Sequence, residues 1–137
     1  MHRDIWRELA EERLVDARAL LAAKQWSGAY YLVGYSIECA LKSLIADGFT
    51  ASTTPVKKFV FDIHTHSLNK LIGFAGLEPD LRSRLSSDLP FQLNWQLVKD
   101  WDETSRYAIW TDKEATDLFS AVDSANNGIF EWVKSKW

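Results

Sequence analysis

The stretch that decides the fold is AYYLVGYSIECALK, residues 29–42. Its apolar side chains recur every three or four positions, which is the spacing of one face of an α-helix. This apolar line runs through Tyr30, Val33, Ile37, Leu41 and Leu44. The pattern predicts a helix that begins at about Ser27 or Gly28 and ends at Ala46, with Gly48 as the residue that stops it.

A second face of this helix carries residues of greater chemical interest. At 100° per residue, Tyr31, Tyr35, Glu38 and Lys42 fall within an arc of roughly 60°. This face has two interpretations. Glu38 and Lys42 have the spacing of a surface ion pair, which contributes about a few tenths of a kcal/mol to a helix. Alternatively, the whole face lies against a second element or lines a ligand cleft.

The flanking sequence predicts further helices. Residues 4–24 have helical spacing, with Asp4 as the N-cap, and the short turn that follows predicts an antiparallel pair with the next helix. Residues 49–62 lack the pattern and read as a long loop, of the kind that is more often functional than a simple connector. A short third helix is predicted over residues 65–74.

The C-terminal half continues in the same way. Pro79 opens a segment with leucines four positions apart, and Pro90 interrupts it, so a bent helix or two stacked helices are expected. Residues 102–110 read as a connector. Thr111 and Glu114 then match a capping box at the start of a last helix that reaches nearly to the C-terminus.

The amino-acid composition also favours a helical fold. The chain has 137 residues with only 6 Gly and 3 Pro, too few to punctuate the many short strands of a sandwich or barrel. We therefore predict an all-α, up-and-down bundle of four to five helices. It is expected to form a single domain over residues 1–137.

Charge and hydropathy limit the partners. The net charge of −3 disfavours broad nucleic-acid binding, and DNA in particular is not an expected partner. No segment approaches the ~20 apolar residues of a membrane span, and the charged N-terminus does not resemble a signal peptide. A cytoplasmic protein without membrane contact is expected. Cys39 is the single cysteine and should be a small buried side chain.

Two further segments contain candidate site residues. His64 and His66 lie near a helix start, but two histidines without cysteines or clustered carboxylates do not make a metal site. No metal and no other cofactor is expected. Arg106 and Tyr107 fall in the predicted connector, where Arg106 could hold a carboxylate or phosphate at two points. The alternative for Arg106 is an ion pair with Glu38 across the bundle.

Three blocks of this sequence together resemble the HEPN domain proteins of bacteria and archaea. The first is residues 29–42, and the second is residues 66–68, close to the His-Asp-Leu pattern of the family with Ser67 in the Asp position. The third is Trp101 with residues 106–107. The resemblance implies a helical bundle that is usually a homodimer. Such proteins are often encoded beside a minimal nucleotidyltransferase and act in toxin–antitoxin or related defence systems.

Many members of this family are metal-independent RNases that depend on an Arg followed, after four to six residues, by a His. Here the required positions after Arg106 hold Thr111, Asp112 and Lys113, so the motif is absent. The resemblance therefore implies a non-catalytic module that binds a nucleotide, RNA or a nucleotidyltransferase partner. A divergent RNase that uses Arg106 and His66 is the alternative.

The predicted ligand site collects the candidates from all three blocks. They are Tyr31, Tyr35, Glu38, Lys42, His66, Arg106 and Tyr107. A further alternative is that these residues form a buried polar network that fixes the register of the helices. In that case the chain is a structural or dimerisation protein with no ligand.

Overall fold

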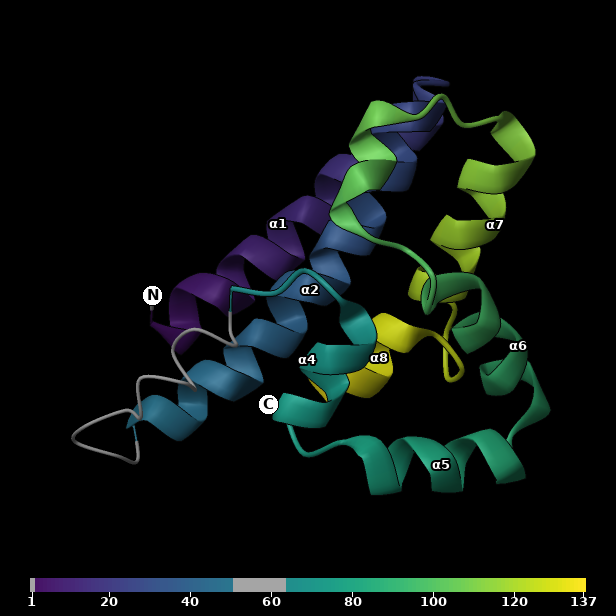
Figure 1. Cartoon of the computed structure of the whole chain (residues 1–137). Coiled ribbons are helices and arrows are strands. Elements are labelled where there is room, and N and C mark those ends of the chain that lie inside the picture. Colours follow the sequence, from purple (N-terminus) through teal and green to yellow (C-terminus); the bar gives the residue numbers. More distant parts are fainter. Residues whose placement is uncertain (1, 51–63) are drawn as a thin grey trace.

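The computed structural model describes residues 2–50 and 64–137, and these form helices joined by turns (Figure 1). In chain order the elements are α1 (Arg3–Ala22), α2 (Trp26–Thr50), α4 (Leu68–Phe74), α5 (Glu78–Ser87), α6 (Leu89–Val98), the 3₁₀ helix η1 (Glu103–Tyr107), α7 (Asp112–Asp123) and α8 (Ile129–Lys134). No strand occurs in the described residues, and the predicted all-α class is confirmed. The expected four to five helices are too few, because two predicted helical segments are each divided in two. The predicted loop over residues 49–62 lies, from residue 51 onward, outside the described residues.

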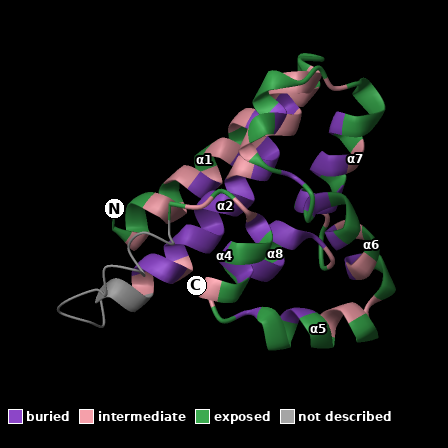
Figure 2. Cartoon of the chain, viewed as in Figure 1, coloured by how far each residue is buried: buried purple, intermediate pink, exposed green. Residues whose placement is uncertain are grey.

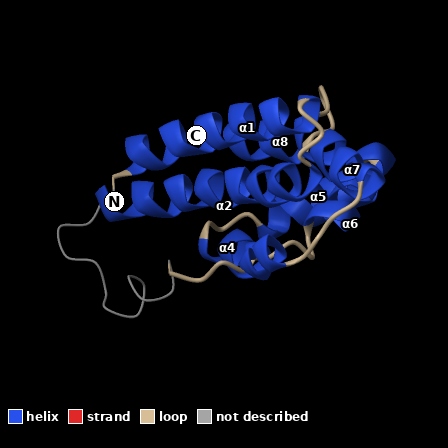
Figure 3. Ribbon diagram, turned by 90° about the horizontal axis from the view of Figure 1, so that it is seen from above, coloured by secondary structure: helices blue, strands red, loops and turns tan. Residues whose placement is uncertain are grey.

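The two longest helices form the framework of the molecule. α1 and α2 lie side by side and antiparallel, as predicted, and the chain reverses at Lys24 with a φ of 62° (Figure 3). α1 buries Ala10, Leu14 and Ala17 against α2. Two of these three side chains are alanines, and small side chains at a helix interface let the two backbones approach closely.

α2 is the central helix. It contacts α1, α4, α7, α8 and η1, and it is buried over most of its length, whereas α5 is mostly exposed (Figure 2). The residues that contact these neighbours include the predicted line of Val33, Ile37 and Leu41, each fully buried. A helix surrounded in this way must be apolar on most of its faces, which explains why its hydrophobic pattern is almost continuous.

The side chain of Trp101 packs against the backbone of α2 at Gly34. The indole of Trp101 is buried and lies directly over Gly34, where an added Cβ would overlap three atoms of the ring. Trp101 stands between the end of α6 and the start of η1. This contact therefore sets the position of η1 against α2.

Three predicted helix ends are wrong. The N-cap of α1 is His2, whose Nδ1 accepts a hydrogen bond from the backbone N of Asp4 at 3.2 Å, and Asp4 instead lies in the first turn. α2 does not end at Ala46, as predicted, but continues through Gly48 to Thr50. Glycine costs a helix interior only about 1 kcal/mol relative to alanine, which a buried helix tolerates. The helix predicted over residues 65–74 begins later, after Ser67, whose Oγ accepts from the backbone N of Lys70 at 3.4 Å.

The segment around Pro90 forms two helices, which is one of the two predicted arrangements. Asp88 ends α5 and caps α6, because its Oδ1 accepts a hydrogen bond from the backbone N of Phe91 at 3.1 Å. The side of α6 that enters the core carries Phe91, Trp95 and Val98. The opposite side of α6 is exposed and carries three leucines four positions apart, Leu89, Leu93 and Leu97.

The segment predicted to form one last helix also forms two, α7 and α8. The capping box of Thr111 and Glu114 is confirmed at the start of α7. α7 ends at Asp123, and a turn with Asn126 at a φ of 70° separates it from α8. A Cβ at Gly128 would overlap the carbonyl oxygen of Ser124, so the turn requires glycine there. The turn lets α8 fold back and bury four of its six residues.

Replacing Gly34 by alanine should destabilise the protein. The added methyl group has no space beside the Trp101 indole, and overpacking of this kind costs typically about 1–3 kcal/mol. The free energy of unfolding can be measured by urea denaturation followed by circular dichroism.

Gly73→Ala is the matched control, because a Cβ there meets only the end of the Glu78 side chain, at 3.3 Å. Gly73 lies in α4, so alanine should be neutral or should stabilise by up to about 1 kcal/mol. Equal effects of the two substitutions would show that Trp101 is not held against Gly34.

Candidate functional site

The candidate residues of α2 lie along one side of the helix as two pairs. The rings of Tyr31 and Tyr35 stack with 6.0 Å between their centroids and 9° between their planes. One turn further on, Nζ of Lys42 donates to Oε2 of Glu38 at 3.2 Å. The two pairs differ in their environment, and this difference decides what each can do.

The Glu38–Lys42 pair is buried, so its interpretation as a surface ion pair is wrong. Glu38 is 1% exposed and Lys42 is 5% exposed. A buried ion pair is tolerated only when its remaining hydrogen-bonding capacity is met, because both ions have lost their hydration. Lys42 also lies over the ring of Trp6 from α1, with Nζ 5.3 Å from the ring centroid.

His66 supplies the second partner of Glu38. Its Nδ1 lies 3.1 Å from each carboxylate oxygen, although the two residues are 28 positions apart in the chain. An ionised carboxylate can only accept, so Nδ1 carries the proton and Nε2 is left on the outer side of the ring. The His66 side chain is half-exposed and covers the carboxylate. We call Glu38, Lys42 and His66 the Glu38 network.

The thiol of Cys39, which follows Glu38 on α2, is closed to solvent. Cys39 is fully buried, as predicted, and burial raises the pKa of its thiol to about 12, although the hydrogen bond from the Tyr35 hydroxyl lowers it. Burial also raises the pKa of Tyr35 above its ordinary value. Both groups are therefore neutral at physiological pH, and Cys39 is not a nucleophile.

Arg106 and Tyr107 lie at the end of η1 and form a pair of their own. The Arg106 guanidinium donates to the Tyr107 hydroxyl at 2.7 Å, and its Cζ lies 4.8 Å from the centroid of the Tyr107 ring. The predicted alternative, an ion pair of Arg106 with Glu38, is wrong. The hydrogen bond to Tyr107 raises the pKa of Arg106 above its ordinary value, and Tyr31 makes a smaller contribution.

Six of the seven predicted site residues therefore fall into two groups. The Glu38 network is one, and the second consists of Arg106 and Tyr107 with Tyr31 beside them. Tyr31 and Glu38 are seven residues apart on α2, which is roughly 10 Å along a helix. Tyr35 lies between the groups and stacks on Tyr31. The structure brings the members of each group together but does not join the two groups into one compact site.

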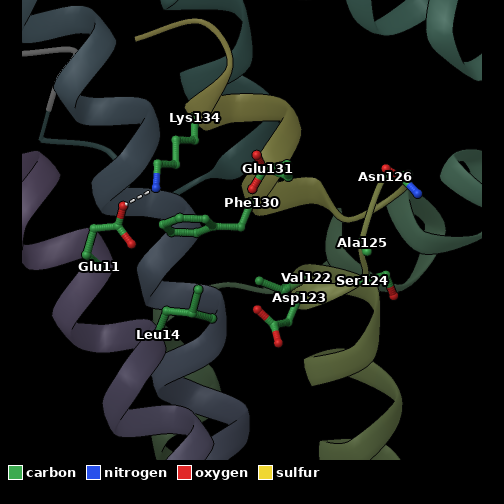
Figure 4. Close-up of a pocket in the computed structure, with 10 residues that line it drawn as sticks. All are labelled: Glu11, Leu14, Val122, Asp123, Ser124, Ala125, Asn126, Phe130, Glu131 and Lys134. Atoms are coloured by element: carbon green, nitrogen blue, oxygen red, sulfur yellow. Dashed lines mark ion pairs between the residues drawn. The ribbon is translucent and has the colours of Figure 1, made fainter.

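A surface pocket that the sequence did not indicate lies between α1, α7 and α8 (Figure 4). Its volume is about 440 Å³, and it is lined by Glu11, Leu14, Val122, Asp123, Ser124, Ala125, Asn126, Phe130, Glu131 and Lys134. Most of its charges are already paired. Lys134 binds Glu11 at 2.7 Å, and Asp123 binds Arg18 at 3.2 Å. The pocket is formed by the turn after α7, which the prediction of one continuous helix did not contain.

Residues 2–50 and 64–137 contain neither a candidate metal site nor a candidate membrane span. Within these ranges no three His, Cys, Asp or Glu side chains are grouped so that they could hold a metal ion. The described helices include none that is both long enough and apolar enough to cross a bilayer.

Comparisons of the chain with protein-family models, with curated proteins and with solved structures give no match. The HEPN resemblance therefore depends on the three sequence blocks and stays a prediction.

Replacing Glu38 by leucine should strongly destabilise the protein. The substitution leaves the Lys42 ammonium buried without its carboxylate, and breaking a buried pair in this way costs about 3–5 kcal/mol. The double variant Glu38→Leu/Lys42→Met removes both charges and should recover most of that loss, as measured by urea denaturation. If the double variant is as unstable as Glu38→Leu, the loss comes from the packing of residue 38 and not from the unpaired charge.

Proposed function

We propose that this chain is a non-catalytic HEPN-type binding module that recognises a partner protein through the surface at the end of η1. The observation that carries this proposal is the exposure of large side chains there. Tyr107 is 75% exposed and Ile109 is 94% exposed, beside the exposed guanidinium of Arg106. We call these three residues the η1 surface. Tyr and Arg are among the residue types that most often dominate the energy of protein interfaces.

The arrangement of the η1 surface suits such a role. The Tyr107 hydroxyl and ring both hold Arg106, so less side-chain entropy is lost when a partner binds. The guanidinium keeps further N–H donors for a carboxylate of the partner. Ile109 adds an apolar contact that has no role in the fold, because almost all of its side chain is in solvent.

Charge favours a protein partner over RNA or a nucleotide. Asp100, Asp102 and Glu103 lie just before Arg106 in the chain, and the whole protein has a net charge of −3. Binding of a polyanion needs several clustered cations to neutralise its phosphates, and the η1 surface offers one. The HEPN resemblance would make this partner a minimal nucleotidyltransferase in a toxin–antitoxin or related defence system.

The Glu38 network supports this proposal in a structural role. Glu38 and Lys42 are too deeply buried to contact a ligand, and His66 ties the start of α4 to α2. For these residues the interpretation as a buried network that fixes helix register is the better supported one.

One observation favours the RNase alternative. A half-exposed histidine whose Nδ1 lies against a carboxylate has the arrangement of a general base oriented by an acid. Lys42 shares that carboxylate, however, and Arg106 contacts α2 about two helical turns from Glu38. Because a phosphodiester needs both groups at the same few atoms, this geometry supports binding better than cleavage.

The HEPN resemblance implies that the neighbouring gene encodes a minimal nucleotidyltransferase. The test of the binding proposal uses the full chain and the protein that this gene encodes, each purified and titrated by calorimetry. Arg106→Ala and Tyr107→Ala should each weaken the complex by tenfold or more, because each removes an exposed residue of the interface. Lys113→Ala is the matched control, since Lys113 is an exposed cation that pairs only with Asp117 on α7. It should leave the affinity unchanged.

Two other results would replace this proposal. If the wild-type chain binds a labelled oligoribonucleotide and Arg106→Ala abolishes that binding, the η1 surface is an RNA site. If the chain cleaves RNA in the presence of EDTA and His66→Ala abolishes cleavage, the chain is a divergent RNase.

The homodimer expected from the resemblance belongs to the same proposal, and α6 offers a surface for it. Leu89, Leu93 and Leu97 are 62%, 53% and 48% exposed and lie four positions apart on one side of the helix. α6 contains no charged residue from Leu89 to Val98. A stripe centred on Leu93 is complementary to itself, because a two-fold axis there places Leu89 of one copy against Leu97 of the other. We propose that α6 packs antiparallel on α6 of a second copy.

Leu93→Glu should convert the dimer to a monomer, because the axis places two like charges together in an apolar contact. Size-exclusion chromatography with light scattering measures the mass, and circular dichroism checks that the variant is folded. Val15→Glu is the control, since Val15 is a 57% exposed apolar residue on α1. It should remain a dimer. A monomeric wild-type chain at ~100 μM would exclude the proposed interface.

A further inference from the structure

A second pocket lies between the start of α2 and a segment made of η1 and the residues that flank it. Its volume is about 300 Å³, within the range of small-molecule sites. It is lined by Tyr30, Asp100, Trp101, Asp102, Thr104, Ser105, Ala108 and Trp110. We call it the η1 pocket. None of the seven predicted site residues lines it.

Aromatic rings form much of its lining. The rings of Tyr30 and Trp110 stack with 3.7 Å between centroids and 10° between planes. Trp110 is held in place by two hydrogen bonds, from its Nε1 to the carbonyl oxygen of Ser105 at 2.9 Å and from its backbone N to Oγ of Ser27 at 2.9 Å. Trp101 contributes a third ring, fixed by its contact with Gly34. The aromatic part of the pocket is therefore preformed.

The charges at the pocket are all of one sign. Asp100 and Asp102 line it, and the described lining contains no Lys, Arg or His. Asp100 makes no hydrogen bond or ion pair with any described residue, whereas Asp102 uses Oδ1 to accept from the backbone N of Thr104 at 2.8 Å. The pKa of Tyr30 is raised above its ordinary value, first by burial and then by Glu114, Asp100 and Asp102.

A buried hydroxyl in the lining is also without a partner. Ser105 is 6% exposed, and its Oγ has no hydrogen-bond partner in the described part of the chain. A buried polar atom left unpaired costs about 1–3 kcal/mol. This hydroxyl is closed to solvent, so it is a feature of the pocket wall and not a contact offered to a bound molecule.

We propose that the η1 pocket binds a guanidinium group. Aromatic faces attract a cation, and the carboxylates supply the opposite charge. The acceptor identifies the kind of cation, because the Asp100 carboxylate can accept N–H bonds that a quaternary ammonium ion cannot offer. A planar guanidinium combines several N–H donors with a flat surface that stacks on Tyr or Trp. The group could belong to a small free molecule or to the arginine side chain of a peptide.

This inference does not depend on the function proposed for the η1 surface. The residues that carry it are Asp100, Asp102 and the three rings, and none of these belongs to the η1 surface. A failure of guanidinium binding would leave the partner-binding test unaffected, and the reverse also holds.

The test is a titration of the ¹⁵N-labelled chain with N-ethylguanidinium, followed by NMR through the indole N–H signals of Trp101 and Trp110. Both signals should shift and saturate. N-ethylurea, which has nearly the same shape but no charge, should cause no saturable shift. Absence of a saturable shift with N-ethylguanidinium, or equal shifts with both compounds, would overturn the proposal.

Two variants identify the pocket. Asp100→Asn removes a carboxylate that has no partner among residues 2–50 and 64–137, and it should weaken N-ethylguanidinium binding at least tenfold. Glu8→Gln is the control for net charge, because Glu8 is an exposed carboxylate on α1, and it should bind as the wild type does. Ala108→Leu should also weaken binding by filling the pocket. Wild-type affinity in both Asp100→Asn and Ala108→Leu would overturn the assignment.

A titration with a peptide distinguishes the two sources of the guanidinium group, a small free molecule and the arginine side chain of a polypeptide. If acetyl-Gly-Arg-Gly-amide binds at least tenfold more tightly than N-ethylguanidinium, the pocket recognises arginine within a polypeptide. If it binds equally or more weakly, the ligand is a small free guanidino compound. Either result supports guanidinium binding.

Discussion

The contact between Trp101 and the backbone of α2 at Gly34 is the constraint on which the functional half of the molecule depends. An indole can lie against a helix only where no side chain intervenes, and the glycine provides that space. Because Trp101 stands directly before η1, its position determines where Arg106, Tyr107 and the η1 pocket are placed. Both proposed binding surfaces are thus positioned by one buried ring, which packs against the central helix of the fold.

A second constraint acts further along α2, and it is electrostatic. The carboxylate of Glu38 is withdrawn from water and is satisfied by Lys42 from its own helix and by His66 from the segment before α4. Because a buried carboxylate without partners would be unstable, His66 has to be near it whenever the fold is formed. The two constraints hold different segments to the same helix, and this is why the predicted residues separate into a structural group and an exposed group.

The sequence predicts the features that depend on local spacing. The helical class, the α1–α2 hairpin, the capping box at Thr111 and the shared side of Tyr31, Tyr35, Glu38 and Lys42 were all predictable, because each follows from periodicity within one segment. The predictions that were wrong concern features that depend on residues distant in the sequence. The spacing of Glu38 and Lys42 cannot show that the pair is buried, since the covering residues are His66 and Trp6, far away in the chain. The break after Asp123 depends on backbone conformations at Asn126 and Gly128 that a hydrophobic pattern does not record.

The arrangement of α1 and α2 also has a consequence for how the chain folds. These two helices are consecutive and joined by a short turn, so contact between them can begin at the residues nearest the turn and extend to pairs as distant as Arg3 and Asp47. Contacts of low sequence separation form fastest, since little chain entropy is lost in closing them. We infer that the α1–α2 hairpin forms early and serves as the template for the later helices. Burial of Trp101 then belongs to a late step, and the fluorescence of this residue would report the completion of folding and not its beginning.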